Sequence, residues 1–185
     1  MMDQLNPRAR RDRYGSRINR DHSPLLAYSL PWATIIMASV VPAFFVASAF
    51  PYFPPLGLLV LIGWRLIRPG LLPIWAGFPL GLWDDLFSGQ PFGSAILLWS
   101  LAMLVFELIE SRFPWRGFAQ DWASASVVTM LVLLGGAVFS GAQITLQLIA
   151  GMGPQLLLSV LFFPFVARVV ARLDRLRLMR FRTIG

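Results

Sequence analysis

Two adjacent carboxylates, Asp84 and Asp85, are the residues of this chain best suited to chemistry, because they lie inside a long apolar segment. An acidic side chain within a membrane helix is costly unless it faces protein or water, so it marks a candidate functional site. Two carboxylates could serve as general acid and base. However, neighbouring residues of a helix point in different directions. No nucleophile, phosphate-binding glycine loop or set of metal ligands accompanies the pair, so we expect a protein that is not an enzyme.

The other reactive residue types are missing or lie elsewhere. The chain has no cysteine, which excludes a disulfide, a thiolate metal site and a cysteine nucleophile. Its single histidine, His22, lies in a polar N-terminal segment. A serine–histidine pair or a histidine-ligated metal therefore cannot be built within the apolar segments. We expect neither a metal nor another cofactor.

Small residues surround the two carboxylates at helical spacing. Gly77, Gly81, Asp85 and Ser88 recur at i, i+4, i+8 and i+11, which places them on one face of a helix. The two glycines would let a neighbouring helix approach closely. Three roles for the carboxylates stay open: capping of the turn that follows, contact with a partner, and transport or catalysis. We predict that Asp85 stabilises this turn through hydrogen bonds to backbone amides, and that Asp84 tolerates substitution better.

An ion pair is expected around Glu107, toward the inner end of the fourth apolar segment. Arg65 and Arg68 close the second segment at a similar depth, and Arg112 follows the fourth. Because a buried charge is tolerated when it is paired, we interpret these residues as an internal ion pair.

Two glutamines, Gln143 and Gln147, lie one helical turn apart near the outer end of the predicted fifth span. They are expected to reach the same leaflet as Asp85. They are therefore candidate hydrogen-bond partners for that carboxylate across the bundle.

The chain is too apolar for a soluble domain. Apolar residues make up 57% of it and charged residues 14%, with a mean hydropathy of +0.67, whereas about a quarter of residues is charged in soluble domains. All sixteen basic residues are arginines; they precede the first apolar segment, close the second and sixth, and follow the fourth. This alternation predicts six spans with both termini in the cytoplasm, and an anionic lipid surface rather than nucleic acid as the partner of the charge. The arginines that follow the N-terminal tail include Arg65, Arg68, Arg112, Arg116, Arg168 and Arg172.

The expected spans and regions follow from the apolar segments. The first five spans cover about residues 30–50, 56–67, 71–87, 92–109 and 122–149, and a turn at 151–154 leads into a sixth that ends near Val170. The second span is short for a hydrocarbon core of about 30 Å, so it borrows from the preceding turn or fails to span fully. We expect a disordered basic tail over 1–29, a six-helix domain over 30–170 and a basic amphipathic extension over 171–185. A signal peptide that ends at Ala47-Ser48-Ala49 is a less favoured alternative.

The segment 77–93 resembles the most recognisable stretch of the rod shape-determining protein MreD family. The residues that match its glycine–aspartate pattern are Gly81, Asp85, Gly89 and Gly93. Asp84 stands where an apolar residue is usual. The layout of the six segments and the basic C-terminal tail are similar as well, so the resemblance covers roughly residues 30–175.

This resemblance implies an all-α membrane protein, a compact bundle of six transmembrane helices similar to the substrate-binding subunits of energy-coupling-factor transporters. It implies a non-enzymatic inner-membrane component of the bacterial cell-elongation complex, needed for cell shape and organised peptidoglycan synthesis. The implied partners are membrane lipids and MreC and, directly or indirectly, MreB, RodA and the elongation penicillin-binding transpeptidase; a homodimer is compatible with these. Two alternatives stay open: a small-solute (vitamin-type) binding subunit of a transporter, which the short outer loops disfavour, and a membrane-embedded lipid-handling enzyme.

Overall fold

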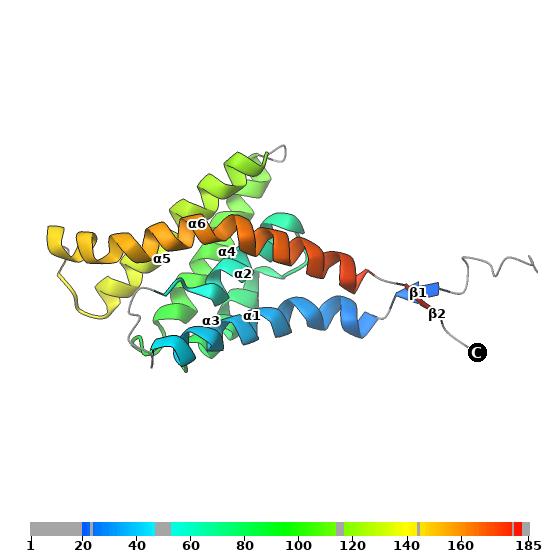
Figure 1. Cartoon of the computed structure of the whole chain (residues 1–185), viewed down its shortest axis with the longest axis horizontal. Helices are drawn as coiled ribbons and strands as arrows, with labels where there is room; N and C mark the ends of the chain where they lie inside the picture. Colours follow the sequence, from blue (N-terminus) through cyan, green and yellow to red (C-terminus); the bar gives the residue numbers. More distant parts are fainter. Residues whose placement is uncertain are drawn as a thin grey trace, which may run out of the picture.

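The computed structural model describes residues 20–22, 24–46, 53–113, 117–143, 145–178 and 180–182. This part of the chain folds into six α-helices, one short 3-10 helix and two very short strands (Figure 1). The helices are α1 (Pro24–Val46), α2 (Leu56–Ile67), α3 (Gly77–Asp85), α4 (Ser94–Arg112), α5 (Phe118–Phe139) and α6 (Leu146–Arg177), with the 3-10 helix η3 (Ile74–Ala76) directly before α3. The strands β1 (Arg20–His22) and β2 (Arg180–Arg182) pair in antiparallel register. The fold is therefore helical, as predicted, with a small ribbon added where the two chain ends meet.

In the described part of the chain, four helices are long and apolar enough to cross a membrane: α1, α4, α5 and α6. Their composition supports the prediction of a membrane protein. The helix α2 has 12 residues and α3 has nine. At 1.5 Å per residue α2 is roughly 18 Å long, against a hydrocarbon core of about 30 Å. Six full-length spans are therefore not confirmed.

The predicted third span, over 71–87, is not one continuous helix. Gly70 has a φ of 78°, and Pro73 is extended with a ψ of 154°, so helical structure begins only at Ile74. Pro79 lies in the first turn of α3. Backbone N–H groups in a first turn have no acceptor within the helix, so the missing N–H of proline costs no hydrogen bond there. Backbone geometry at Gly70 and Pro73, rather than a change in hydropathy, sets where this helix starts.

The boundary between the fifth and sixth segments also differs from the prediction. The helix α5 ends at Phe139, and Gly141 follows with a φ of 76°. The helix α6 begins at Leu146, where the Thr145 hydroxyl accepts a hydrogen bond of 3.2 Å from the Leu148 amide. It then continues through 151–154, and a proline inside a membrane helix is tolerated where its surroundings satisfy the freed carbonyl. The predicted turn at 151–154 is therefore wrong.

The helix α2 is the most enclosed element, with eight buried residues. Leu58 and Trp64 of this helix are fully buried. They belong to one apolar cluster with side chains of α1, α4 and α6, among them Ile35, Met103 and Val170. The longer helices thus pack around α2. Burial of its side chains among them stabilises a helix that is too short to span the hydrocarbon core by itself.

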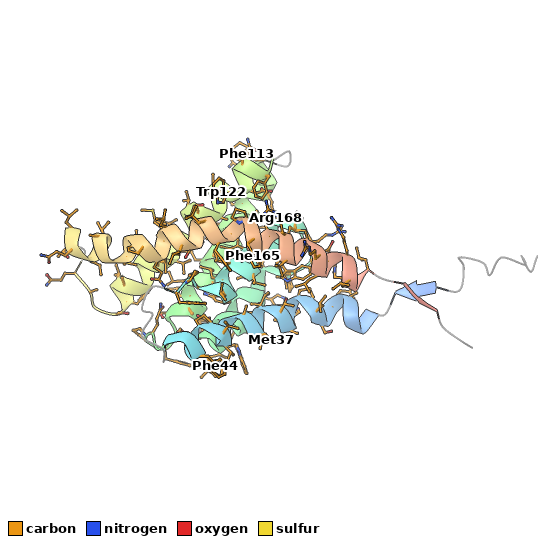
Figure 2. All side chains as sticks on the ribbon, in the orientation of Figure 1. Met37, Phe44, Phe113, Trp122, Phe165 and Arg168 are labelled. Atoms are coloured by element: carbon orange, nitrogen blue, oxygen red, sulfur yellow. The ribbon has the colours of Figure 1, made fainter. Side chains whose placement is uncertain are left out.

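The long helices also present apolar side chains outward. Met37 of α1 points away from the bundle (Figure 2). On α4 a stripe of leucines is more than half exposed: Leu97, Leu101, Leu104 and Leu108. Helices that are apolar on both their packed and their exposed faces are typical of lipid surroundings.

Contacts between distant residues show that successive helices run in alternate directions. Arg68, just after α2, and Arg177, at the end of α6, both contact Asp174, and Arg65 contacts the end of α4. We call this side of the bundle the arginine end. We call the opposite side, which holds the turn 86–93 between α3 and α4, the turn end.

Candidate functional site

One buried side chain, Asp85, organises the turn between α3 and α4. The carboxylate is held by four donors, and the residue is only 6% exposed. The amides of Gly93 and Ala95 each donate to it at 2.9 Å. Longer bonds come from the Ile96 amide at 3.3 Å and the Ser94 hydroxyl at 3.4 Å. The carboxylate at the end of α3 therefore caps the first turn of α4, where a negative charge is favourable. The predicted hydrogen bonding of Asp85 to this turn is confirmed.

The helix α4 takes its cap from α3 because its own N-cap residue is glycine. Gly93 has a φ of 96° and no side chain that could accept a hydrogen bond. The first amides of a helix have no intrahelical partner, and each one left buried and unpaired costs about 1–3 kcal/mol. The two oxygens of Asp85 satisfy several of these amides at once. The cap thus connects the end of α3 to the start of α4.

The helix that Gly77 and Gly81 were predicted to approach is α4 of the same chain. A Cβ atom at Gly77 would lie 2.7 Å from the carbonyl oxygen of Trp99. One at Gly81 would lie 2.5 Å from the carbonyl oxygen of Ala95. Real Cβ atoms do not approach backbone this closely, so a side chain at either position would push the two helices apart. The glycine face is filled internally and does not form an open groove for a partner.

The exposed part of the motif is the turn itself. Gly89 and Gly93 have φ values of 68° and 96°, a backbone region that favours glycine. Leu86 and Phe92, on either side of Gly89, are 60% and 70% exposed. The motif therefore presents large apolar side chains on a turn whose shape is set by its glycines and by the Asp85 cap.

Asp84 has different surroundings from Asp85. Its carbonyl oxygen accepts hydrogen bonds from the Phe87 and Ser88 amides at 3.0 and 2.8 Å. Its side chain lines a pocket at the turn end. Because Asp85 is occupied by backbone and hydroxyl donors, the two carboxylates do not form an acid–base pair.

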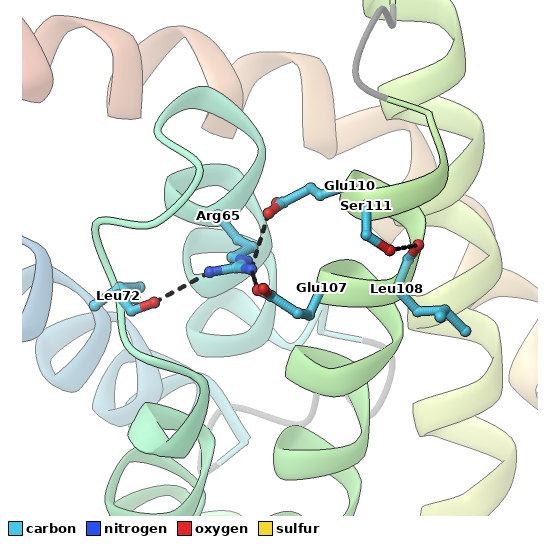
Figure 3. Close-up of polar contacts among 6 residues, drawn as sticks. All are labelled: Arg65, Leu72, Glu107, Leu108, Glu110 and Ser111. Atoms are coloured by element: carbon cyan, nitrogen blue, oxygen red, sulfur yellow. Dashed lines mark hydrogen bonds and ion pairs between the residues drawn. The ribbon is translucent and has the colours of Figure 1, made fainter.

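A buried arginine lies at the opposite end of the bundle. Arg65 is 2% exposed, and it donates to the Leu72 carbonyl oxygen at 3.1 Å. Its guanidinium also pairs with Glu107 and, at 2.8 Å, with Glu110 (Figure 3). The predicted ion pair of Glu107 with Arg65 is confirmed. Glu110 was missed, although its position three residues after Glu107 on the same helix would have indicated a shared partner.

Arg68 makes a different ion pair from the one predicted. It pairs with Asp174 at 2.8 Å, and Arg177 pairs with the same carboxylate at 2.8 Å. Arg177 also lies over the Trp64 ring, 5.8 Å from its centre, and donates to the Ala27 carbonyl oxygen at 3.1 Å. Asp174 therefore connects α2 with α6. The sequence offered one signal for it, an isolated acid among the arginines of the C-terminal segment.

The remaining predicted residues do not gather at either cluster. Arg112, Arg168 and Arg172 are exposed, as Figure 2 shows for Arg168, and Arg116 lies outside the described residues. Gln143 is exposed in the loop after α5, and Gln147 is exposed in the first turn of α6. Their predicted pairing with Asp85 is wrong, because Asp85 bonds to residues 93–96 instead.

A metal centre is not evident in the described ranges, where no group of three or more His, Cys, Asp or Glu side chains could hold an ion. The sequence model of the family "rod shape-determining protein MreD" matches residues 24–173, which is most of the chain. Comparison with curated proteins and with solved structures finds no match. The matched range contains the whole α3–α4 turn with its Asp85 cap, and the Arg65 cluster.

Proposed function

The chain belongs to the MreD family of rod shape-determining proteins, and we propose that it acts by binding rather than by catalysis. Membership gives it a role in determining rod shape. In our proposal it is an integral protein of the bacterial inner membrane that holds MreC in the cell-elongation complex. MreB, RodA and the elongation penicillin-binding transpeptidase then join directly or through MreC.

One observation carries this proposal: the buried carboxylate Asp85 holds a turn in shape instead of facing a substrate. The turn is fixed from beneath by hydrogen bonds to Gly93 and Ala95. Its apolar residues Leu86 and Phe92 are exposed. A surface that is already ordered loses little conformational entropy when a partner binds. We therefore propose the turn end as a contact surface for MreC.

We also propose six passes of the membrane with both termini in the cytoplasm. The alternating helix directions support this, because Arg65, Arg68 and Arg177 meet at one end. Short arginine-rich segments stay on the cytoplasmic side, so the arginine end would face the cytoplasm. The short helices α2 and α3 would complete their passes with the residues that flank them. A fold like that of energy-coupling-factor substrate-binding subunits belongs to this proposal.

The exposed arginines Arg112, Arg168 and Arg172 would then face the anionic inner leaflet. Each basic residue near such a surface contributes about 1 kcal/mol of attraction. This charge would hold the arginine end at the lipid headgroups while the turn end meets the partner.

The proposal is tested by co-purification from the native membrane in mild detergent. Replacing Phe92 with serine should lower the recovery of MreC by about tenfold, the effect of removing one well-packed interface residue. Phe113→Ser is the matched control, because Phe113 is 64% exposed but lies at the end of α4 away from the turn. Depletion of the protein should make rods round up while synthesis of wall precursors continues. Equal loss of MreC in both variants would show that the turn is not part of the contact surface.

A second candidate is favoured by the pocket beside Asp84, which a small-solute binding subunit of a transporter would need. Cells that kept their shape after depletion but lost uptake of a small solute would establish transport in place of scaffolding.

A further inference from the structure

The turn end contains a pocket of about 370 Å³ that the proposed contact with MreC does not use. It lies between α1, the start of α2 with the residues just before it, the end of α3, the turn, and one residue each of α5 and α6. Pockets for small molecules typically measure about 300–1,000 Å³. The pocket is therefore large enough for a small organic group.

The pocket has a negative charge that the described residues do not balance. Asp84 is the single acidic residue among the described lining residues, and none of these is basic. Asp84 forms no ion pair with any arginine of the described ranges, where the buried arginines lie at the other end of the bundle. A carboxylate in a partly enclosed site favours a positive partner.

Two neutral side chains of the pocket lining, Ser39 and Gln155, can accept hydrogen bonds. Ser39 is 5% exposed and its hydroxyl lies beside the Asp84 carboxyl, to which it can donate while its oxygen lone pairs remain able to accept. Gln155 uses its Nε2 to donate to the Phe53 carbonyl oxygen at 3.0 Å, which leaves its Oε1 as an acceptor. A primary ammonium group has three donors and no acceptor, so it complements the Asp84 carboxylate in charge and these two neutral acceptors in hydrogen bonding.

The rest of the lining suits the carbon part of such a ligand. Pro42, Phe87 and Leu133 contribute apolar surface to the pocket. We propose that this pocket binds the protonated primary amine of a small ligand, with Asp84 as the counter-charge and Ser39 as a hydrogen-bond acceptor. The amine can come from a soluble molecule or from the headgroup of an amine-bearing lipid, since both would reach the end of a membrane helix bundle.

The test uses the full chain in nanodiscs of phosphatidylglycerol. The soluble probe is ethanolamine, and choline is its matched control because it has the same charge but no N–H donor. The lipid probe is phosphatidylethanolamine added to the nanodisc, with phosphatidylcholine as control. Bound probe is counted by native mass spectrometry, and stabilisation is followed as the shift of the thermal unfolding midpoint.

Three variants separate the pocket from the rest of the protein. Asp84→Asn keeps the size of the side chain and removes its charge. Ala43→Phe fills the pocket from α1. Asp121→Asn is the control, because Asp121 lies in the first turn of α5, twelve residues and roughly 18 Å along the helix from Leu133.

We expect ethanolamine or phosphatidylethanolamine to bind at least tenfold more tightly than its choline counterpart. Asp84→Asn and Ala43→Phe should each remove this preference, and Asp121→Asn should retain it. Binding of the lipid alone would identify the headgroup as the source, and binding of ethanolamine alone would identify a soluble amine. Failure of both probes, or an unchanged preference in Asp84→Asn, would overturn the proposal. Neither result bears on MreC recovery, so the two proposals fail separately.

Discussion

Asp84 and Asp85 are neighbours in the chain, yet their side chains face unlike surroundings. Asp85 is enclosed by the donors of residues 93–96, and Asp84 lines the pocket at the turn end. Adjacent helical residues differ by about 100° in direction, so one carboxylate reaches the helix cap and the other reaches the pocket. At the scale of the residue, the two acids are therefore expected to respond differently to substitution.

The cap predicts a graded response at Asp85. Asp85→Leu removes every acceptor for the amides of α4 and should destabilise the protein by about 2 kcal/mol or more. Asp85→Asn keeps one oxygen of similar position and should cost about half as much. Both changes should be mild at Asp84, which supplies no bond to the cap. Unfolding of the four variants in detergent measures the order, and equal tolerance of leucine at both positions would contradict it.

The close contact between α3 and α4 predicts that Gly81 cannot accept a side chain. Gly81→Ala places a methyl group against the backbone of Ala95, and overpacking of this kind costs about 1–3 kcal/mol. Gly151→Ala is the control, because a Cβ atom there meets nothing within 4 Å. Melting curves should show a lower midpoint for Gly81→Ala and an unchanged or higher one for Gly151→Ala. The opposite order would mean that the two helices separate easily.

At the scale of the element, hydropathy located the helices better than it located their ends. The range 56–67 was predicted from the apolar run and is the observed range of α2. The end of α5 was placed ten residues too late, at 149 instead of 139. Apolar composition shows which residues can lie in lipid, whereas a helix stops where the backbone turns. Gly141 turns with a positive φ, but Gly151 and Pro154 stay helical, and composition does not distinguish them.

The contacts of the candidate site also fall into two kinds, those between residues close in sequence and those between distant residues. Capping by Asp85 depends on residues only eight to eleven positions away, so local spacing was sufficient to predict it. The pair of Arg68 with Asp174 joins positions 106 apart. No periodicity within one segment indicates which end of a distant helix will lie beside it, so this contact was predictable only once the fold was known.

The ion pairs of Asp174 with Arg68 and Arg177, which connect α2 with α6, predict an order of destabilisation. Asp174→Asn leaves the buried Arg177 without its carboxylate, and breaking a buried pair costs about 3–5 kcal/mol. Arg177→Gln should cost less, because Asp174 keeps Arg68. Arg68→Gln should cost about 1 kcal/mol or less, since Arg68 is half exposed and solvent screens it. Chemical unfolding of the three variants gives the order. A larger loss of unfolding free energy for Arg68→Gln than for Asp174→Asn would contradict the role of Asp174 in connecting α2 with α6.

At the scale of the whole molecule, the alternating helix directions predict which positions face the same side of the membrane. The chain has no cysteine, so a single introduced cysteine is the only thiol in it that a reagent can label. Cysteines at the exposed positions Ser88 and Gln143 should react with an impermeant thiol reagent from outside the cell, and one at Ser111 should not. Reaction of all three from outside, or the reverse pattern, would exclude the proposed topology.

The β1–β2 ribbon has a consequence for the order in which the protein is made. It pairs Arg20, before α1, with Arg182, after α6. The N-terminal strand leaves the ribosome first, because domains emerge and fold from the N-terminus during synthesis. Its partner strand emerges only after the six helices between the two strands. The strand β1 therefore has no partner until α6 has been made, so the β1–β2 ribbon is a contact that can form only after all six helices have left the ribosome.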